Sequence, residues 1–581
     1  MTELLQTDLS FSVSTPDAEI RANYVNPVFD DESGDNPAKA AIDAILEQKI
    51  KVHRQNNMVI DAICDDLATR AEFFHEDITD AKYQPRLYLH MKESGEILDL
   101  FEANHLDDLL TTRYGLQLKT SLLKTVAEHV CQRVRQTGQP VTVCSGYHYD
   151  AGNSTMYVSV DPLRVLRMSA TEVEYVDNVV DGLLFLPSGE PIDVDLDSIR
   201  ASKLGLMVQP GSLMYDYFDA SYSDETISAE FNRQLVCTRI LALFFPNLFT
   251  SRSLLILDGE PGCGKTILSQ KSGWLMQGSR FEVSILSSKK EDVETLLTSD
   301  PLVVLDNLDE PALIRRYTSL LCQTVTGGKI NKRQLYSNHT KLSYPLIASV
   351  ICTSIDLGWV RTTIADRALI IQLAPRVKDG QNTPDVNIKV EALKVRNALM
   401  TEVLGRCRNI LIALEAQADY NPPHILRLHD FTGFVLRSAV HEGWADTALD
   451  ILRAVARAQH DEADANNPTH DVIRQYIGCF QKSCHDRLSA TNLGKRFKEA
   501  AADLKLDARF EWGPYGMRGV LNKQFSSLRS KFGLCRDDDA SNNSRVYWFE
   551  PNPEQLESCK DFVRQSLPSS YETNTLGLEA L

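Results

Sequence analysis

Apolar residues change their spacing several times along this 581-residue chain, and each change predicts a different kind of element. Residues 98–114 and 118–136 repeat Leu, Val and Ile at the interval of a helix. Short alternating or β-branched runs come next, separated by Gly and Pro, which is typical of strands joined by turns. These runs lie at residues 141–144, 156–160, 173–176 and 183–186. We therefore expect a compact α+β N-terminal domain over residues 51–210.

A different pattern follows an amphipathic helix predicted over residues 226–245. Strands that are apolar on both faces and connected by helices are typical of a mostly parallel sheet. The predicted fold class is therefore α/β, with a core over residues 211–390. The strand-like runs of this core lie at residues 253–257, 282–286, 302–305, 346–352 and 368–373.

Helical spacing continues beyond the core. Residues 391–457 are predicted to form a helical lid, broken near Asn421-Pro422-Pro423. The polar residues 458–470 are expected to be a linker. Residues 471–550 are predicted to form helices, followed by a strand pair at 518–520 and 546–549.

Charge and polarity predict mobile ends. Residues 1–50 carry ten acidic residues against three basic ones, which is typical of a flexible acidic arm, here with a short helix near residues 38–49. Residues 551–581 are expected to be a loose tail.

Composition narrows the class of protein. Apolar residues make up 43% and charged residues 24%, as in folded globular proteins. No run reaches the roughly 18 apolar residues of a membrane span, and the first residues lack the basic and apolar stretches of a secretory signal. Twelve cysteines occur without a CxxC pair, which argues against a structural zinc site or a disulfide framework. We therefore expect a cytoplasmic protein that does not bind membranes.

The first motif with chemical meaning spans residues 259–266, Gly-Glu-Pro-Gly-Cys-Gly-Lys-Thr, which fits G-x-x-x-x-G-K-[ST] between an apolar run and a helix. Glycines let the backbone surround a phosphate with N–H donors at the positive end of the helix. Lys265 is expected to contact the β- and γ-phosphates of ATP, and Thr266 to bind Mg²⁺. The predicted cofactor-binding residues are Gly259, Glu260, Pro261, Gly262, Cys263, Gly264, Lys265, Thr266 and Ile267.

An acidic element follows, as nucleotide hydrolysis requires. Asp306 ends an apolar run and is predicted to orient Mg²⁺. The next residue is Asn307, whereas most hydrolysing relatives have a glutamate that polarises the attacking water. Asp309 and Glu310 follow, and either could act as the base or simply cap a helix.

Two further residues fit an oligomeric ATPase. Thr353 ends the next apolar run, where a polar side chain would sense the γ-phosphate or hold the attacking water. Arg367 precedes the last run, where ring-forming ATPases place the finger that reaches a neighbouring subunit's phosphate. An intramolecular pair of Arg367 with Asp366 or Asp356 is the alternative.

Charge is distributed unevenly along the chain. The formal net charge of −18 argues against a uniformly basic surface. Residues 311–345 nevertheless contain six Lys or Arg, one His and no acidic residue. Within them, residues 328–344 are predicted to form a hairpin that lines a pore and binds the DNA backbone, with a solvated surface hairpin as the alternative. The hairpin side chains expected to contact DNA are those of Lys329, Lys332, Arg333, His339 and Lys341.

The C-terminal region is also basic, because residues 481–550 hold thirteen Lys or Arg against nine acidic residues. Helices predicted at 494–504 and 522–532, followed by a strand at 546–549, favour a winged-helix DNA-binding domain over residues 471–550. The alternative is a winged helix that binds protein. The second helix carries the expected DNA contacts Lys523, Arg529 and Lys531.

Several short motifs follow one another in a fixed order. They are Asp306-Asn307, Thr326-Gly327-Gly328, Arg333-Gln334-Leu335-Tyr336, Val350-Ile351 and Asp366-Arg367-Ala368-Leu369. This order resembles that of the helicase-like AAA+ ATPases of bacterial phages, plasmids and genomic islands, and the resemblance covers about residues 60–440. Those ATPases are similar to superfamily 3 and minichromosome-maintenance helicases and to the staphylococcal cassette self-loading helicases.

This resemblance implies a P-loop AAA+ core with a helical lid, and it implies hexameric rings that move along DNA. It also implies that Arg427, in an R-x-x-D-F element of the lid, is a second nucleotide sensor. In the family, the position of Thr353 is often Asn. The N-terminal region resembles a domain that lies beside primase modules, so a primase or another replication factor is an expected partner.

Together the residues and the resemblance predict a helicase or translocase that uses ATP and Mg²⁺. It would act as a homo-oligomeric ring, expected to be a hexamer, on single-stranded or forked DNA in the replication of a mobile genetic element. One alternative is a DNA-stimulated ATPase that does not unwind DNA, such as a phage-defence sensor or a helicase loader. Another is a structural protein with a degenerate nucleotide site.

Overall fold

The structure is a computed structural model, and it describes residues 37–566 except for several gaps. Residues 1–36 of the expected arm and residues 567–581 of the expected tail lie outside the described residues. The gaps are residues 79–84, 102–104, 118–119, 334–340, 356, 358, 361, 376–384, 466–467, 480–482, 505–515, 524 and 540–543.

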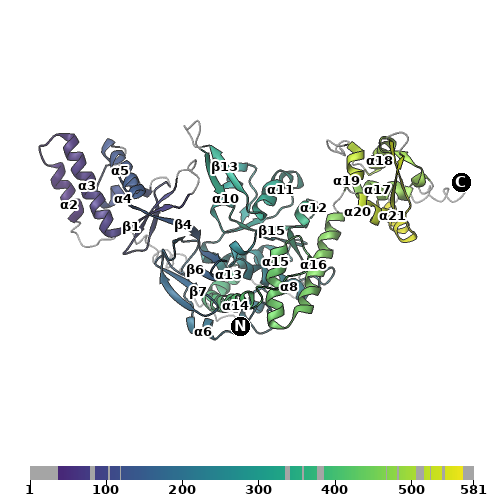
Figure 1. Ribbon diagram of the computed structural model, residues 1–581, viewed down its shortest axis with the longest axis horizontal. Coiled ribbons are helices and arrows are strands. Elements are labelled where there is room, and N and C mark those ends of the chain that lie inside the picture. Colours follow the sequence, from purple (N-terminus) through teal and green to yellow (C-terminus); the bar gives the residue numbers. More distant parts are fainter. Residues whose placement is uncertain are drawn as a thin grey trace, which may run out of the picture. The chain divides into compact units, whose positions relative to one another are not determined.

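The chain divides into two compact units, whose elements are labelled in Figure 1. The first unit consists of residues 1–356 and 366–456. The second consists of residues 357–365 and 457–581. The predicted mixed α/β class is confirmed at this level, because helices and strands alternate through most of the described chain.

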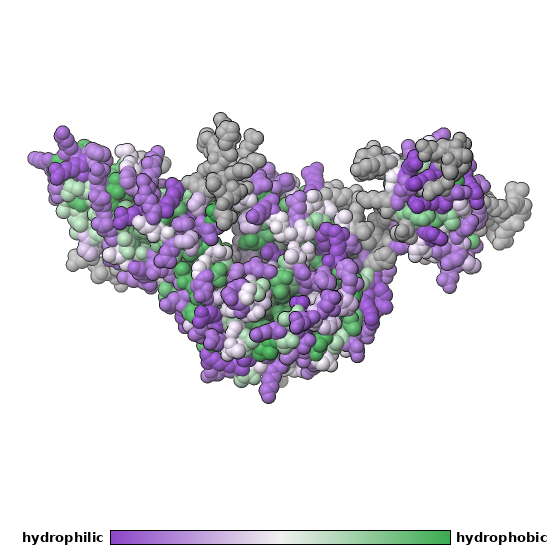
Figure 2. Space-filling view, viewed as in Figure 1, coloured by the Kyte–Doolittle hydropathy of each residue, from purple (hydrophilic) through white to green (hydrophobic). Residues whose placement is uncertain are grey.

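The N-terminal part of the first unit packs helices against a mixed sheet with the strand order β3-β2-β1-β4-β9. Each helix buries an apolar stripe, as Val59, Ile63 and Leu67 do on α3. Hydrophilic residues cover the outer surface of α2 and α3 (Figure 2). The elements are α2 (Pro37–Leu46), α3 (Val52–Arg70), β1 (Ala71–Glu76), β2 (Leu87–Met91), β3 (Ile97–Asp99), α4 (His105–Tyr114), α5 (Ser121–Thr137), β4 (Gln139–Ser145) and β9 (Leu183–Leu186).

Two predictions for this part were wrong. The single helix expected over residues 98–114 is strand β3 followed by α4, because the chain first pairs with β2. The helix near residues 38–49 is α2, and it belongs to the folded domain rather than to a flexible arm. Its Ile42 is 1% exposed and lies in the same apolar core as Ile63, so an apolar position outweighs the acidic composition around it.

A second sheet and three connecting helices follow within the same unit. The sheet is an antiparallel meander in the order β5-β6-β7-β8. Its strands are β5 (Tyr147–Asp150), β6 (Thr155–Ser159), β7 (Arg164–Met168) and β8 (Val173–Asp177), and the helices are α6 (Leu196–Ala201), α7 (Leu213–Tyr217) and α8 (Ala229–Ala242).

The predicted parallel sheet is confirmed. All five strands are parallel, in the order β11-β12-β15-β10-β16, and the strands other than the short edge strand β11 are almost entirely buried. The elements are β10 (Leu254–Gly259), α9 (Lys265–Gln277), β11 (Ser284–Ile285), α10 (Lys290–Ser299), β12 (Leu302–Asp306), α11 (Pro311–Val325), the hairpin strands β13 (Lys329–Arg333) and β14 (Lys341–Pro345), β15 (Ser349–Ser354) and β16 (Ala368–Leu373).

Helices occupy the predicted lid, but the predicted linker was wrong. Residues 458–465 continue helix α16. They are polar, but they include Ala, Gln and Glu, which have high helix propensity. The helices of this region are α13 (Asp385–Lys394), α14 (Arg396–Ala416), α15 (His429–Glu442) and α16 (Ala445–Ala465).

A buried ion pair fixes α14 to the segment that connects the N-terminal part with the parallel sheet. The Arg406 side chain is fully buried and donates to the Glu402 carboxylate at 2.9 Å and to the carbonyls of Gly205 and Met207 at 2.8 and 3.0 Å. Glu402 in turn accepts a hydrogen bond from the Leu213 amide at 2.8 Å. The segment is therefore held by charge-assisted bonds as well as by packing.

The second unit has its own apolar core, in which Phe497, Leu521, Leu528 and Tyr547 are fully buried. Its three strands pair antiparallel in the order β17-β19-β18. The elements are α12 (Thr362–Ala365), α17 (Pro468–Cys479), β17 (Leu488–Ser489), α18 (Ala490–Asp503), α19 (Gly516–Lys523), α20 (Phe525–Phe532), β18 (Leu534–Asp539), β19 (Ser544–Phe549) and α21 (Pro553–Ser566).

Three predictions for this unit were wrong in detail. Residues 518–520 lie in helix α19, and the strand that pairs with β19 is β18. The helix expected over residues 522–532 is divided into α19 and α20. Part of the expected tail forms α21, whose Cys559 is 1% exposed in the core. The sequence of β18 ends in Asp537-Asp538-Asp539 and shows no apolar alternation, and Asp is depleted in strands, so the pattern did not predict this strand.

Replacing Glu402 by Ala should lower the free energy of unfolding by about 3–5 kcal/mol, because Arg406 would remain buried without its carboxylate. Denaturant unfolding measures the change. Thr401→Val on the same helix is the control, since it removes only neutral hydrogen bonds, one from the Asp195 amide and one to the Asn397 carbonyl, and should cost about 1 kcal/mol. Equal losses in the two variants would contradict a dominant role for the ion pair.

Candidate functional site

The loop between β10 and α9 has the backbone that its glycines predict. Gly262 and Gly264 have φ of 82° and 99°, in the left-handed region that favours glycine. A Cβ on Gly259 would lie 2.5 Å from the Leu373 carbonyl oxygen and 2.9 Å from Cys263 Sγ. The start of the loop is therefore packed too closely for any residue other than glycine at position 259. Its tip, Glu260, Pro261 and Gly262, is exposed.

Lys265 begins α9 and folds back into this loop. Its side chain is largely buried, and Nζ donates to the carbonyls of Gly259 at 2.5 Å and Glu260 at 3.0 Å. Nζ also lies 3.8 Å from the sulfur of Cys263, which is 1% exposed. The ammonium group thus sits inside the curve of the loop, at the positive end of a 13-residue helix.

Two strands and the start of helix α9 bring one carboxylate and two hydroxyls together. Thr266 Oγ1 donates to Asp306 Oδ1 at 3.0 Å, and Thr353 Oγ1 donates to the same oxygen at 2.6 Å. Thr266 lies in α9, after the loop that follows β10, whereas Asp306 and Thr353 lie at the carboxyl ends of β12 and β15. These three strands are parallel, so their carboxyl ends lie at one edge of the sheet. The loop, the acidic strand and the polar end of β15 therefore form one site.

Thr353 has a different position from the one expected of a γ-phosphate sensor. It is 0% exposed, its hydroxyl hydrogen is donated to Asp306, and its oxygen accepts from the Asn307 amide at 2.9 Å. In this arrangement the hydroxyl positions Asp306 and the turn after it, and no donor remains for a phosphate.

The three polar candidates that follow Asp306 lie in different environments. Asn307 is exposed and has φ of 55°, a conformation that Asn tolerates better than most residues. Asp309 accepts from the Ile355 amide at 2.8 Å, so its carboxylate already ties this turn to the end of β15. Glu310 is exposed at the start of α11, and its side chain does not cap the helix.

Arg367 lies at the opposite edge of the sheet from the glycine loop. Its carbonyl accepts from the amide of Leu254, the first residue of β10, and β10 then runs six residues to Gly259. At about 3.3 Å per residue, the strand separates the Arg367 backbone from the loop by about 17 Å. The adjacent Asp366 pairs with Arg427 at 3.3 Å. Asp356, the other carboxylate considered as a partner of Arg367, lies outside the described residues.

The described residues of the basic segment form the predicted hairpin strands. Strand β13 pairs antiparallel with β14, which places Arg333 opposite Lys341 and Lys332 opposite Leu342. Lys329 is exposed at its base, and His339 lies outside the described residues. Arg86 of the N-terminal part stacks on Tyr344 at 5.7 Å, so the base of the hairpin contacts that part of the unit.

The basic residues of the second unit lie on two helices rather than one. Lys523 is the last residue of α19, whereas Arg529 and Lys531 are in the last turn of α20. Arg529 is exposed. Lys531 is partly buried, and this burial lowers the pKa of its amine. Only Arg529 is therefore seen as a solvent-facing cation on α20.

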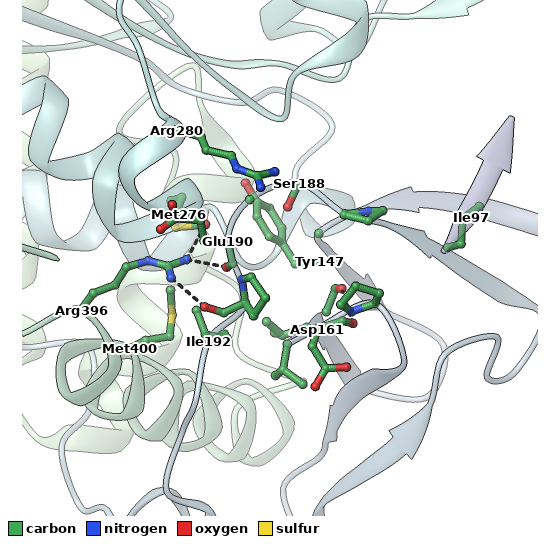
Figure 3. Close-up of a pocket in the computed structure, with 18 of the residues that line it drawn as sticks. Ile97, Tyr147, Asp161, Ser188, Glu190, Ile192, Met276, Arg280, Arg396 and Met400 are labelled. Carbon is green, nitrogen blue, oxygen red and sulfur yellow. Dashed lines mark hydrogen bonds between the residues drawn. The ribbon is translucent and has the colours of Figure 1, made fainter. Parts of the chain in front are cut away.

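A cavity that the sequence did not reveal lies near the C-terminal end of α9 (Figure 3). It has a volume of about 360 Å³, and Met276, near the end of α9, lines it together with Arg396 of α14. Arg396 donates to the carbonyls of Pro191 at 3.0 Å and Glu190 at 3.1 Å (Figure 3). It also donates to the carbonyl of Leu275 at 3.1 Å. One guanidinium group thus joins α9, α14 and the loop before α6.

Comparisons with known proteins leave the family open. No protein-family model matches the sequence, and no curated protein matches it. The chain is similar to the apo structure of the NrS-1 C terminal region (305-718), with a TM-score of 0.37 and 10% identity over 82% of this chain and 96% of that one. The A form apo structure of the same region gives a TM-score of 0.36 and 10% identity, over 84% and 98%. These TM-scores are too low to assign a fold family.

The described residues include no cluster of three or more His, Cys, Asp or Glu side chains that could hold a metal. None of the described helices is both long and apolar enough to cross a membrane.

Replacing Thr353 by Val should lower the free energy of unfolding by about 1–3 kcal/mol, because Asp306 Oδ1 and the Asn307 amide would each lose a buried partner. Thr353→Ser keeps the hydroxyl and should retain most of the stability. Urea unfolding of the three proteins measures this. A Val variant as stable as the wild type would show that the hydroxyl does not hold the turn.

Proposed function

We propose that this protein is a ring-forming, Mg-ATP-dependent DNA helicase or translocase that acts in the replication of a mobile genetic element. The observation that carries the proposal is the meeting of Thr266, Asp306 and Thr353 beside a glycine loop that encloses Lys265. A glycine turn without a role in nucleotide binding would not require a carboxylate and a hydroxyl from two other strands beside it.

We infer that residues 211–390 are a P-loop AAA+ core with its helical lid over residues 391–457. The glycine loop follows the interior strand β10, and the central strand β15 lies between β10 and the acidic strand β12. The inferred winged helix over residues 471–550 is supported by helices α18 to α20, followed by the hairpin of β18 and β19.

The residues of the loop fit ATP and Mg²⁺. The loop amides and Lys265 would hold the phosphates, and Thr266 and Asp306 would ligate the metal, each by one oxygen. The bound Mg²⁺ would neutralise charge that develops on the phosphates. At present Lys265 donates to loop carbonyls, so its ammonium is held where a phosphate would replace them.

We assign the water-activating role to Glu310 in preference to Asp309. Asp309 already accepts a hydrogen bond from the Ile355 amide, whereas Glu310 is exposed and makes no capping bond. Asn307 can orient a water molecule but cannot accept its proton. An asparagine where most hydrolysing ATPases have a glutamate favours slow turnover. The second candidate function is therefore a DNA-stimulated ATPase that does not unwind DNA.

The position of Arg367 supports the proposed ring. About 17 Å of strand separates its backbone from its own glycine loop, so its side chain would act on the nucleotide of a neighbouring copy. The paired Arg427 and Asp366 lie beside it and would place the lid at the same boundary between copies.

Arg367→Ala should reduce ATP hydrolysis by about 10³-fold and leave nucleotide binding unchanged, because the charge would be lost only from the transition state. Lys265→Ala should lose nucleotide binding as well. Mixing the two inactive variants tests the arrangement: an Arg367→Ala copy supplies an intact loop and a Lys265→Ala neighbour supplies an intact arginine. Recovery of hydrolysis in the mixture is expected, and its absence would refute action between copies.

Lys341→Ala should leave basal hydrolysis unchanged and remove its stimulation by DNA, because one phosphate contact of the hairpin would be lost. Lys124→Ala, which changes an exposed lysine on α5, is the matched control. Hydrolysis with and without forked DNA measures the effect. Unchanged stimulation would exclude the hairpin from DNA binding, and stimulated hydrolysis without strand displacement would favour the non-unwinding ATPase.

A further inference from the structure

The cavity near the C-terminal end of α9 has the size and the lining of a small-molecule site. Its volume of about 360 Å³ falls within the range of ligand pockets, roughly 300–1,000 Å³. Apolar side chains of the N-terminal part of the unit and of helices α9 and α14 line it together. They include Ile97, Val160, Ile192, Phe244, Met276 and Met400.

The loop after β9 forms a fixed wall of this cavity. The Glu190 amide donates to the Gln277 carbonyl, at the end of α9, at 3.0 Å. The Ile192 amide donates to the Val160 carbonyl, just after β6, at 2.8 Å. A Cβ on Gly189 would lie 2.6 Å from Gln277 Cα, so the two backbones are in close contact there. The wall is therefore held by the protein's own bonds, as in preformed ligand sites.

One carboxylate of the lining has an oxygen that no described residue satisfies. Glu96 Oε2 is buried and has no hydrogen-bond partner among the described residues, and the same is true of the Tyr147 hydroxyl. Burial raises the pKa of the Glu96 carboxyl, against a smaller opposite effect of His105. A buried carboxylate needs a hydrogen-bond donor, and a positively charged donor gives the strongest bond.

The other charged groups of the lining have partners or face solvent. Asp161 accepts from two backbone amides at 2.8 and 2.9 Å, and Glu190 accepts from one at 3.0 Å. Arg396 donates to three carbonyls. Arg280 is exposed, so water screens its charge. The Glu96 carboxylate is therefore the charged group that a ligand would match.

Water fits this cavity less well than an organic molecule does. At about 30 Å³ per molecule, roughly twelve water molecules would fill it, and each buried water typically makes about three hydrogen bonds. The apolar side chains of the walls offer none, so an apolar body that displaces these waters is favoured. Met276 and Met400 are flexible side chains that can adapt to the shape of such a body.

We propose that this cavity binds a small organic amine, whose amino group is hydrogen-bonded to Glu96 and whose apolar body packs against Met276 and Met400. The Tyr147 hydroxyl provides a second polar contact. Aliphatic amines and heterocycles with an amino group share this chemistry. The site lies at the opposite end of α9 from Lys265, so it is separate from the proposed nucleotide site and does not depend on the proposed function.

Isothermal titration calorimetry of the full chain with two matched pairs of probes tests the proposal. Phenethylamine and phenethyl alcohol differ in an amino group, and so do cytidine and uridine. In at least one pair, the amino compound should bind about tenfold more tightly, because only it donates an amino N–H to the carboxylate. The pair that shows the difference identifies the kind of amine. Equal affinities within both pairs would overturn the proposal.

Glu96→Gln should weaken the binding of that amine by about tenfold, because the charge-assisted bond is lost. Glu93→Gln is the matched control, since it changes an exposed carboxylate in the same connection between β2 and β3 and should leave binding unchanged. The titrations are repeated with excess Mg-ATP. Binding that ATP abolishes, or that Glu96→Gln retains in full, would place the amine elsewhere and overturn the proposal.

A further measurement needs no probe. Because a buried carboxylate without a partner destabilises the folded state, Glu96→Gln should leave Tm unchanged or raise it. Thermal unfolding of the wild type and the variant, without amine, measures this. A lower Tm in the variant would show that the carboxylate stabilises the fold, and it would overturn the proposal.

Discussion

One carboxylate oxygen, Asp306 Oδ1, holds the candidate site together. It accepts hydrogen bonds from Thr266 at the start of α9 and from Thr353 in β15, and Asp306 is buried. A carboxylate with two hydroxyl donors is strongly oriented, because either bond alone would allow it to rotate. The geometry of the loop, the turn at Asn307 and the end of β15 all depend on this contact.

Arginines provide a second constraint, and they act mainly through backbone carbonyls. Arg396 joins the end of α9 to α14 and to the loop before α6, and Arg406 fixes α14 to the connecting segment. The planar guanidinium group can donate in several directions at once, so a single side chain holds three segments. The helix that begins at Lys265 is therefore tied at its far end to the N-terminal part of the unit.

The sequence by itself determined the elements whose stabilisation is local. The alternation of apolar runs and helices was sufficient for the parallel sheet, and the glycine pattern for the loop at Lys265, because backbone conformation there follows from residue type. The polarity of Asp306 at the end of a buried strand also identified the site. Charge alone was less reliable, since residues 458–465 are polar yet continue a helix.

Only the tertiary structure decided which distant groups meet. Nothing in the sequence indicates that Thr353 donates to Asp306, that Asp366 pairs with Arg427, or that Arg396 reaches three carbonyls. The burial of Ile42 was likewise missed. These contacts join residues far apart along the chain, and their geometry depends on strand order and helix packing. Local spacing encodes neither, which is why the candidate residues could be listed from the sequence but their roles could not.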